Sequence, residues 1–155
     1  MSEETKQKII DGARKSLIKE GHRLSTIKVI AGYAGVNHGL VHHYFGSKED
    51  LMVALIESQA QKALNLLFRN HPDWLEEITK GRRPKGLAKM KQREIVQFMR
   101  TRMDQFFLIY DDFAKIHIEF LAMSAEMPKV LKKLKENLRK HRKLLGLVFN
   151  KSNPG

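Results

Sequence analysis

Apolar residues recur at every third or fourth position along most of the chain, and this spacing is typical of helices with one buried face. In the first segment, Ile9, Ile10, Ala13 and Leu17 fall on one side in this way. No stretch shows the alternation of period two that a half-buried strand requires. The pattern predicts an all-α protein, with helices over residues 5–20, 27–34, 38–45, 48 to about 70, 87–110, 113–127 and 129–149, and one or two turns over 73–79.

Residues that favour helix ends lie at the expected boundaries. Gly21 is suited to end the first helix. Thr26 and Asn37 are suited to cap the N-termini of the second and third helices. Ser47, with Asp50 three positions later, forms a capping box that opens the fourth helix.

Residues 26–45 combine two short helices with a tight turn at Gly35, where glycine can supply the positive φ of a sharp bend. Ala31 is small at the point where two crossed helices would touch. Together these features are typical of a helix-turn-helix, whose second helix lies in the major groove of DNA. The apolar residues that can fill the small core between the helices are Ile30, Ala34, Val36, Val41 and Phe45.

Two strings of residues carry a resemblance to a known family. They are Ala31-x-x-Ala34-Gly35-Val36-Asn37-x-Gly39 and Tyr44-Phe45-x-Ser47-Lys48-Glu49-Asp50-Leu51. With the helices around them, residues 5–56 resemble the tetracycline-repressor-like (TetR) family of bacterial transcriptional regulators. The resemblance implies an N-terminal three-helix DNA-binding domain over residues 1–47, followed by a C-terminal helical ligand-binding and dimerisation bundle over residues 48–155.

We expect DNA contacts around the second and third helices. A helix that begins at Asn37 directs backbone N–H groups and its positive dipole end toward phosphate, and its outer side chains can meet base edges. Lys48 lies in the first turn of the next helix, where a cation is unfavourable unless a phosphate is near. The expected DNA-binding residues are Thr26, Lys28, Asn37, His38, Gly39, Leu40, His42, His43, Tyr44 and Lys48.

Four of these residues allow a second interpretation. Gly39 indicates either a close approach of the backbone to DNA or close packing against another helix. Lys48 is either a phosphate contact or an exposed lysine without a role. The resemblance implies a phosphate-contacting Tyr at position 42, where this chain has His42, which can still donate one hydrogen bond. Tyr44 either shares that role or belongs to the core.

The charge balance favours a polyanionic partner. The 155 residues include 29 Lys and Arg against 17 Asp and Glu, a formal net charge of +12. Most of the excess lies in residues 80–103 and 129–155, which each hold nine basic residues and one acidic residue. The first block includes the basic loop at residues 80–86, which is either solvated or in contact with DNA or an anionic ligand.

Other function classes are disfavoured by what the sequence lacks. Without Cys there are no disulfides, zinc–thiolate sites or Cys nucleophiles, and the composition fits a cytoplasmic protein. Without a Gly-rich phosphate loop or a G-x-S-x-G motif, we expect no enzyme and no cofactor. His38 and His42 have a spacing that suits a metal, but no carboxylate or thiol in the same helix completes a site. No apolar run approaches the roughly 18 residues of a membrane span, so no membrane partner is expected.

The resemblance further implies a ligand pocket among the middle helices. Their Met and aromatic residues suit an unidentified, small, moderately apolar effector, although plain bundle core accounts for them equally well. The residues expected to line this pocket are Met99, Met103, Phe106, Tyr110, Phe113, His117 and Phe120.

The last helix has an apolar seam that alternates by three and four, which suits packing against another helix. The resemblance implies a dimer built from two C-terminal helices per subunit, whereas the chain has one such helix before it ends at residues 150–155. The residues expected in the dimer interface are Leu131, Leu134, Leu138, His141, Leu145 and Val148.

These observations lead to one main functional prediction. The chain is expected to be a ligand-responsive DNA-binding transcriptional repressor that binds a palindromic operator as a homodimer. The alternative is a constitutive, basic helical nucleic-acid-binding protein without an effector response. That alternative fits the net charge, but it leaves the ordered motif over residues 26–51 unexplained.

Overall fold

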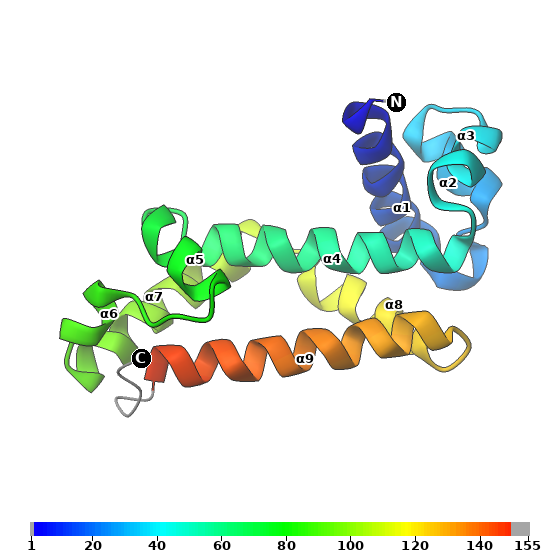
Figure 1. Cartoon of the computed structure of the whole chain (residues 1–155). Helices are drawn as coiled ribbons and strands as arrows, with labels where there is room; N and C mark the ends of the chain where they lie inside the picture. The colour runs from blue at the N-terminus through cyan, green and yellow to red at the C-terminus, as the bar shows by residue number, and fades with distance from the viewer. Residues whose placement is uncertain (1, 150–155) are drawn as a thin grey trace. The chain divides into compact units, whose positions relative to one another are not determined.

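The computed structural model describes residues 2–149, and within that range it contains helices and no strand, which confirms the all-α prediction (Figure 1). None of the helices in this range combines the length and the apolar character that crossing a membrane requires. The helices are α1 (Glu3–Leu24), α2 (Ile27–Ala34), α3 (His38–Phe45), α4 (Lys48–Leu67), α5 (Pro72–Thr79), α6 (Lys85–Lys89), α7 (Gln92–Ile109), α8 (Phe113–Ser124) and α9 (Pro128–Phe149).

The helices group into two compact units. The first contains the chain up to Gln59 together with Asp112–Leu134, and the second contains Ala60–Asp111 together with α9 from Lys135 onward. Helices α4 and α9 each contribute to both units. The first unit thus contains the start of α4 and all of α8 as well as the three N-terminal helices. The expected boundary between a DNA-binding domain and a ligand-binding domain, at residues 47 and 48, stays a prediction.

In the first unit, α1 packs on α2 and α8 through its apolar face, of which Ile9, Ala13 and Leu17 are fully buried. The crossing with α2 is close, because a Cβ added at Gly12 would lie 2.7 Å from the Cβ of Ala34. The helical backbone breaks at Gly21, as expected, where φ is 76° and ψ is 168°. Helix α1 then continues to Leu24 rather than ending at residue 20, so the first helix was predicted too short.

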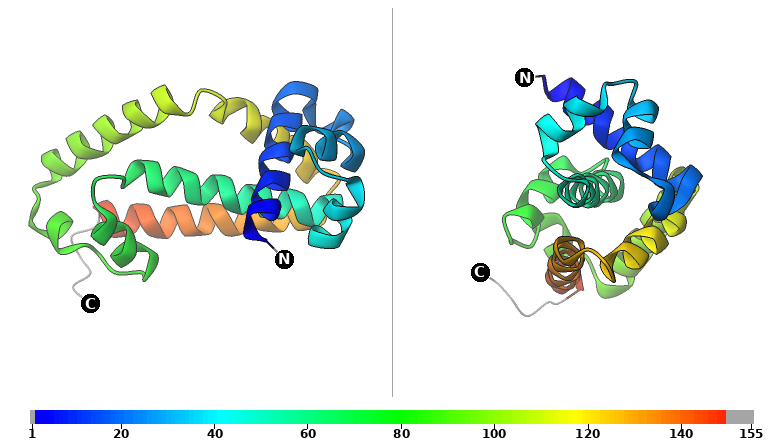
Figure 2. Two further views of the ribbon diagram at one scale, coloured as in Figure 1. Left: turned by 90° about the horizontal axis from the view of Figure 1, so that it is seen from above. Right: turned by 90° about the vertical axis from the view of Figure 1, so that its right-hand side faces the viewer.

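The start of α9 runs beside the start of α4 in the same direction (Figure 2). The ammonium of Lys129 lies 2.6 Å from the Asp50 carboxylate, and one turn later the ammonium of Lys133 pairs with Glu57. Beneath these pairs the two helices share a core with α8, in which Val130 is fully buried. Acidic residues of α4 therefore neutralise part of the cationic charge of α9.

The second unit has its own core. One of its expected helices is interrupted at a position that the sequence pattern did not predict. The single helix expected over residues 87–110 is two helices, α6 and α7, separated by extended backbone at Met90 and Lys91. The backbone N–H of Lys91 donates to the Glu94 carboxylate at 2.6 Å, which caps the start of α7. The fully or almost fully buried residues of this core are Phe68, Ile78, Leu87, Ile95 and Val148.

Candidate nucleic-acid interface

The turn between α2 and α3 is built by local hydrogen bonds that the sequence predicts. Thr26 caps α2, its Oγ1 accepting the Val29 N–H at 3.3 Å. Gly35 ends α2 in the left-handed region, with φ 66° and ψ 34°, and the N–H of Val36 donates back to the Ala31 carbonyl at 3.0 Å. This is the hydrogen bonding of a Schellman C-cap, which needs glycine at the left-handed position. The turn therefore confirms the predicted role of Gly35.

Helix α3 begins with a second predicted cap, and no other helix covers its N-terminal end. The Asn37 Oδ1 accepts the Gly39 N–H at 2.8 Å. A Cβ added at Gly39 would meet only this oxygen, at 3.3 Å, because no other helix lies within 4 Å. Close packing against another helix, one of the two interpretations of Gly39, is therefore wrong. Open space at Gly39 is compatible with a close approach of DNA to the backbone, which stays a prediction.

The core beneath the two helices is small and apolar, as predicted. Ile30 and Val41 are fully buried and Ala31 is 3% exposed, while Ala34, Val36 and Phe45 are partly buried and pack against them. Val41 is the one buried residue of α3. Tyr44 and Phe45 are partly buried beside it, and the residues of the helix that are exposed are His38, Gly39, Leu40, His42 and His43.

His42 makes a hydrogen bond within its own turn that changes what it can offer to a phosphate. Its Nδ1 lies 3.2 Å from the Gly46 carbonyl oxygen, which can only accept. In this arrangement Nδ1 carries the proton of the neutral ring, and Nε2 is an acceptor. The neutral side chain then has no second N–H for a phosphate, and protonation of Nε2 would supply one. The donor expected of neutral His42 is thus already used by the protein.

Tyr44 shows features of both interpretations. Its ring is partly buried and packs against the core, and it meets the His43 ring edge-on at 5.6 Å between centroids. Its hydroxyl lies at the surface, 3.5 Å from the Ser2 carbonyl at the start of α1. The ring therefore stabilises α3, while the hydroxyl remains accessible beside the N-terminus of α1.

Lys48 is not the exposed lysine without a role that one interpretation required. Its ammonium donates to the His22 carbonyl at 2.8 Å, and the side chain is partly buried. Burial lowers the pKa of Lys48, and the nearby Glu126 carboxylate opposes this shift. Lys48 thus joins the start of α4 to the end of α1, and a phosphate contact stays a prediction.

The electrostatic character of this surface comes from the absence of acids rather than from many bases. No carboxylate occurs between Glu20 and Glu49 in the sequence. The remaining two expected DNA contacts, Thr26 and Lys28, are exposed at the start of α2. The segment that forms the turn and both helices is therefore free of side chains that would repel phosphate.

The residues expected to line an effector pocket are divided between the two units. The pocket itself stays a prediction. Met99, Met103, Phe106 and Tyr110 lie on or directly after α7 in the second unit, and the other three lie on α8 in the first. On α8, the Phe113 and His117 rings lie 4.0 Å apart between centroids and are tilted by 35°, and Phe120 is buried in the core. The His117 Nδ1 lies 2.7 Å from the Phe113 carbonyl.

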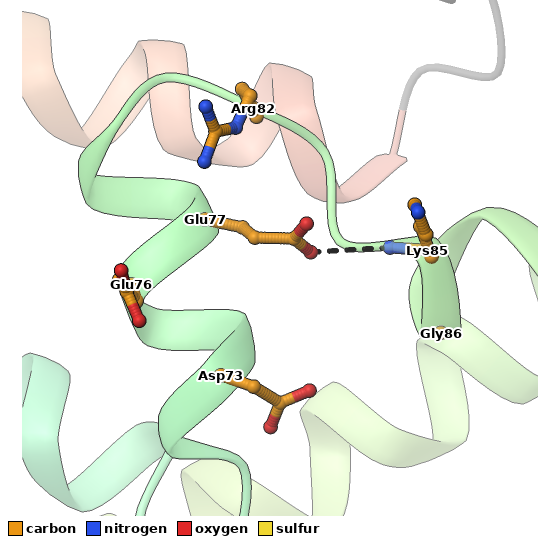
Figure 3. Close-up of a pocket in the computed structure, with 6 residues that line it drawn as sticks. All are labelled: Asp73, Glu76, Glu77, Arg82, Lys85 and Gly86. Carbon is orange, nitrogen blue, oxygen red and sulfur yellow. Dashed lines mark hydrogen bonds between the residues drawn. The ribbon is translucent and has the colours of Figure 1, made fainter.

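A polar pocket of about 360 Å³ lies in the second unit, where sequence analysis predicted none (Figure 3). Glu77 and Asp73 point into it from α5, and the Glu77 carboxylate accepts the Lys85 N–H at 3.3 Å. The basic loop is held against α5, because the Arg82 N–H donates to the Glu77 carbonyl at 2.9 Å. None of the expected pocket residues lines this pocket, whose lining residues are Asp73, Glu76, Glu77, Arg82, Lys85 and Gly86.

The expected dimer seam on α9 divides into two faces. Leu138 is 68% exposed, and Leu131, His141 and Leu145 are exposed as well. By contrast, Leu134 packs against the core of the first unit, and Val148 is fully buried in the core of the second. Val148 therefore offers no surface to a partner in this structure, because it is packed inside the second core. The interface itself stays a prediction.

Comparisons with known proteins agree with the geometry of the α1–α4 region. The family model described as bacterial regulatory proteins, tetR family, matches residues 9–55, from the middle of α1 into α4. The repressor AcnR of Corynebacterium glutamicum is 29% identical over 77 residues, which cover 50% of this chain and 39% of AcnR. The regulator BetI of Rhizobium meliloti is 44% identical over 50 residues, 32% of this chain and 25% of BetI.

A third relative is the repressor Rv3405c of Mycobacterium tuberculosis, 31% identical over 87 residues, 56% of this chain and 46% of that protein. The matches span less than half the length of these curated relatives. No solved structure matches the chain. All three relatives are named as transcriptional regulators or repressors, in agreement with the expectation that the chain is no enzyme. Residues 9–55, which include the complete helix-turn-helix, thus match the tetR family of bacterial regulatory proteins.

Proposed function

We propose that the protein is a transcriptional repressor that binds a palindromic operator as a homodimer and loses affinity for it when a small effector binds. The observation that carries the proposal is the α2–Gly35–α3 turn, capped at both helices and exposing an acid-free helix, in the segment that matches the family. Two of the similar proteins, AcnR and Rv3405c, are named as repressors. A protein that binds chromosomal DNA works in the cytoplasm of a bacterium, so that location is part of the proposal.

In the proposed complex α3 lies in the major groove, as the second helix of such a motif does. His38, Leu40 and His43 are exposed on it and face base edges and thymine methyl groups. Phosphate contacts come from the backbone at the open start of α3 and from side chains at its border, such as Lys28 and the Tyr44 hydroxyl. Phosphate contacts set position and affinity, whereas the base contacts set sequence preference.

A direct link between α8 and the end of α1 supports the effector response. The Glu119 carboxylate on α8 accepts the backbone N–H of His22 at 2.7 Å and lies 2.9 Å from the His22 Nδ1. The carbonyl of the same His22 accepts the Lys48 ammonium at the start of α4. The end of α1 is thus tied to α8 and α4 through one residue, so a shift of α8 would move the DNA-binding helices.

A buried amide on α4 also supports a small-molecule partner. Gln59 is 2% exposed, and neither its amide nitrogen nor its amide oxygen has a hydrogen-bond partner within residues 2–149. Leaving a buried donor or acceptor unsatisfied costs about 1–3 kcal/mol, so such groups are rare in proteins without a role. An effector that offered one donor and one acceptor would satisfy both atoms.

Operator binding and effector response can be tested together. DNase I footprinting on the promoter of the protein's own gene should show one protected palindrome, with loss of protection by His38→Ala at protein concentrations that saturate the wild type. Compounds found by thermal shift are then added to the complex, and an inducer must bind the free protein more tightly than the DNA-bound protein. Gln59→Leu should keep the footprint and lose the response. Equal affinity for the promoter and for random DNA would instead favour the constitutive nucleic-acid-binding protein.

A further inference from the structure

Two histidines lie one helical turn apart on the exposed surface of α3. His38 and His42 are four residues apart in this helix, and both are exposed. Residues with this spacing are neighbours on the surface of a helix, and two histidines placed in this way hold zinc in the H-E-x-x-H helix of metalloproteases. The pair therefore has the spacing of two ligands to one metal ion.

The hydrogen bonding of the two rings leaves nitrogen lone pairs for a metal. The His42 Nδ1 donates to the Gly46 carbonyl, 3.2 Å away, so the Nε2 of the neutral ring has a free lone pair. A backbone carbonyl that accepts the other ring N–H is a common support of a metal-binding histidine. The side chain of His38 has no hydrogen bond to any residue that the structure describes, so its ring can turn toward the same ion.

The described part of the chain does not complete this site. Within residues 2–149, no three His, Cys, Asp or Glu side chains are grouped in a way that could hold a metal ion. No carboxylate occurs between Glu20 and Glu49 in the sequence, and the N-terminal end of a helix is unfavourable for a cation. Two neutral ligands in this setting bind an ion weakly, so tight binding needs an anionic ligand from outside the chain.

A DNA phosphate supplies that anion in the proposed complex. Helix α3 would lie in the major groove, which phosphates border on both sides. The Nε2 of neutral His42 and a phosphate oxygen are both acceptors, so they cannot hydrogen-bond to each other. We propose that a divalent transition-metal ion such as Zn²⁺ binds His38 and His42 together with a phosphate oxygen of the operator, and thereby strengthens DNA binding. The inference rests on the proposed function and adds a metal ion to its DNA contacts.

The ligand set decides which ions fit and how they act. Imidazole nitrogen suits zinc, copper and nickel ions, whereas magnesium takes oxygen ligands. The ring of His38 keeps a second nitrogen, whose proton can still be donated to a base edge. Because the phosphate is present only in the complex, metal and DNA each raise the affinity of the protein for the other by the same factor.

The test is the operator affinity of the whole chain, measured by fluorescence anisotropy in EDTA and in micromolar free Zn²⁺. Zinc should raise the affinity of the wild type by about fivefold or more, and Mg²⁺ at the same concentration should not. His42→Ala should lose this gain. The matched control is His43→Ala, since His43 is equally exposed on α3 but adjacent residues of a helix do not face each other. It should keep the gain, whatever its affinity in EDTA.

Each variant is compared with itself in the two buffers, so differences in affinity without metal do not affect the result. Equal wild-type affinity in EDTA and in zinc, or a gain that His42→Ala retains, would overturn the proposal. Because phosphates occur in all DNA, zinc should also strengthen binding to a random duplex of the same length, and His42→Ala should lose that gain as well. Such a gain without any preference for the operator would contradict the repressor function and leave the metal site intact.

Discussion

Helices α3 and α9 show that net charge and DNA recognition are separate properties of this chain. The eight residues of α3 include no Lys, Arg, Asp or Glu, yet α3 is the helix that the proposed function places in the major groove. The 22 residues of α9 include eight Lys and Arg and one Glu. Part of that charge is used inside the protein, because Lys129 and Lys133 pair with acidic residues of α4.

Net charge alone would therefore predict α9 as the DNA-binding helix, whereas the helix-turn-helix geometry favours α3. The specific features of α3 are geometric: two caps, a left-handed glycine and a fully buried Val41 that leaves the histidines outside. Long-range attraction to DNA still depends on total charge. Mutations in the α3 region are therefore expected to change stability and the preference for one DNA sequence. Mutations of α9 are expected to change the affinity for all DNA sequences alike.

The largest effect is expected from the packing that supports α3, at a pair of glycines. Gly12→Ala should destabilise the fold by about 1–3 kcal/mol, because its Cβ would lie 2.7 Å from the Ala34 Cβ at the α1–α2 crossing. Gly32→Ala is the matched control on α2, where no atom lies within 4 Å of the added Cβ. It should stabilise the fold by about 0.5–1 kcal/mol through helix propensity. Urea unfolding measures the change in the free energy of unfolding for both variants. Changes of the same sign would contradict the close crossing of α1 and α2.

The next effect concerns what DNA recognises. His38→Ala should cost about 1–3 kcal/mol on the best operator and less on operators changed at one base pair, so that sequence preference is relaxed. Lys140→Ala on α9 should leave sequence preference unchanged and reduce affinity for all DNA slightly. Binding titrations against a set of single-base operator variants separate the two patterns. A loss of preference with Lys140→Ala would show that α9 contacts bases.

A smaller effect is expected from the side chain of His42. Since its Nδ1 faces the Gly46 carbonyl, the neutral ring has no second N–H to donate to a phosphate. His42→Ala should therefore lower operator affinity by less than about tenfold, which is below the size of one hydrogen bond to a charged group, and should leave sequence preference unchanged. Fluorescence anisotropy at constant pH and ionic strength measures the difference. A change in sequence preference would show that His42 contacts a base.

The sequence best predicted those features that depend on residues close together in the chain, such as helix ends. Thr26, Asn37 and Gly35 act within their own turns, and α2 and α3 have the predicted bounds. Buried positions such as Val41 follow from the spacing of apolar residues along one helix. In these cases the physical cause lies within four or five residues of its effect.

Contacts between distant segments could not be predicted in this way. The partner of Lys48 is a backbone carbonyl 26 residues earlier, and every residue has such a carbonyl. The burial of Val148 depends on which side of α9 faces the second core, and the apolar seam is wide enough to allow several. The break at Met90 and Lys91 has no glycine or proline to mark it.

The smallest predicted effect concerns the charge that α9 uses inside the protein. The ammonium of Lys129 lowers the pKa of Asp50, with help from the Ser47 hydroxyl, and Asp50 raises the pKa of Lys129. A lowered carboxyl pKa gives stability above the usual value of 3.8 that is lost as pH falls through the lowered pKa. A raised ammonium pKa gives stability below the usual value of 10.5 that is lost as pH rises through the raised pKa.

The pair therefore stabilises the fold only in the window between these two limits. Lys129→Ala should shift the urea midpoint to slightly lower concentration at neutral pH, with the difference from wild type vanishing in strong acid, where Asp50 is protonated. The effect is small and falls with added salt because the pair is exposed. Lys132→Ala, an exposed lysine one turn later, is the control and should match the wild type throughout. A difference that persisted unchanged in acid and in salt would show that Lys129 acts through packing of its aliphatic stem, and α9 would then owe its position beside α4 to apolar contacts alone.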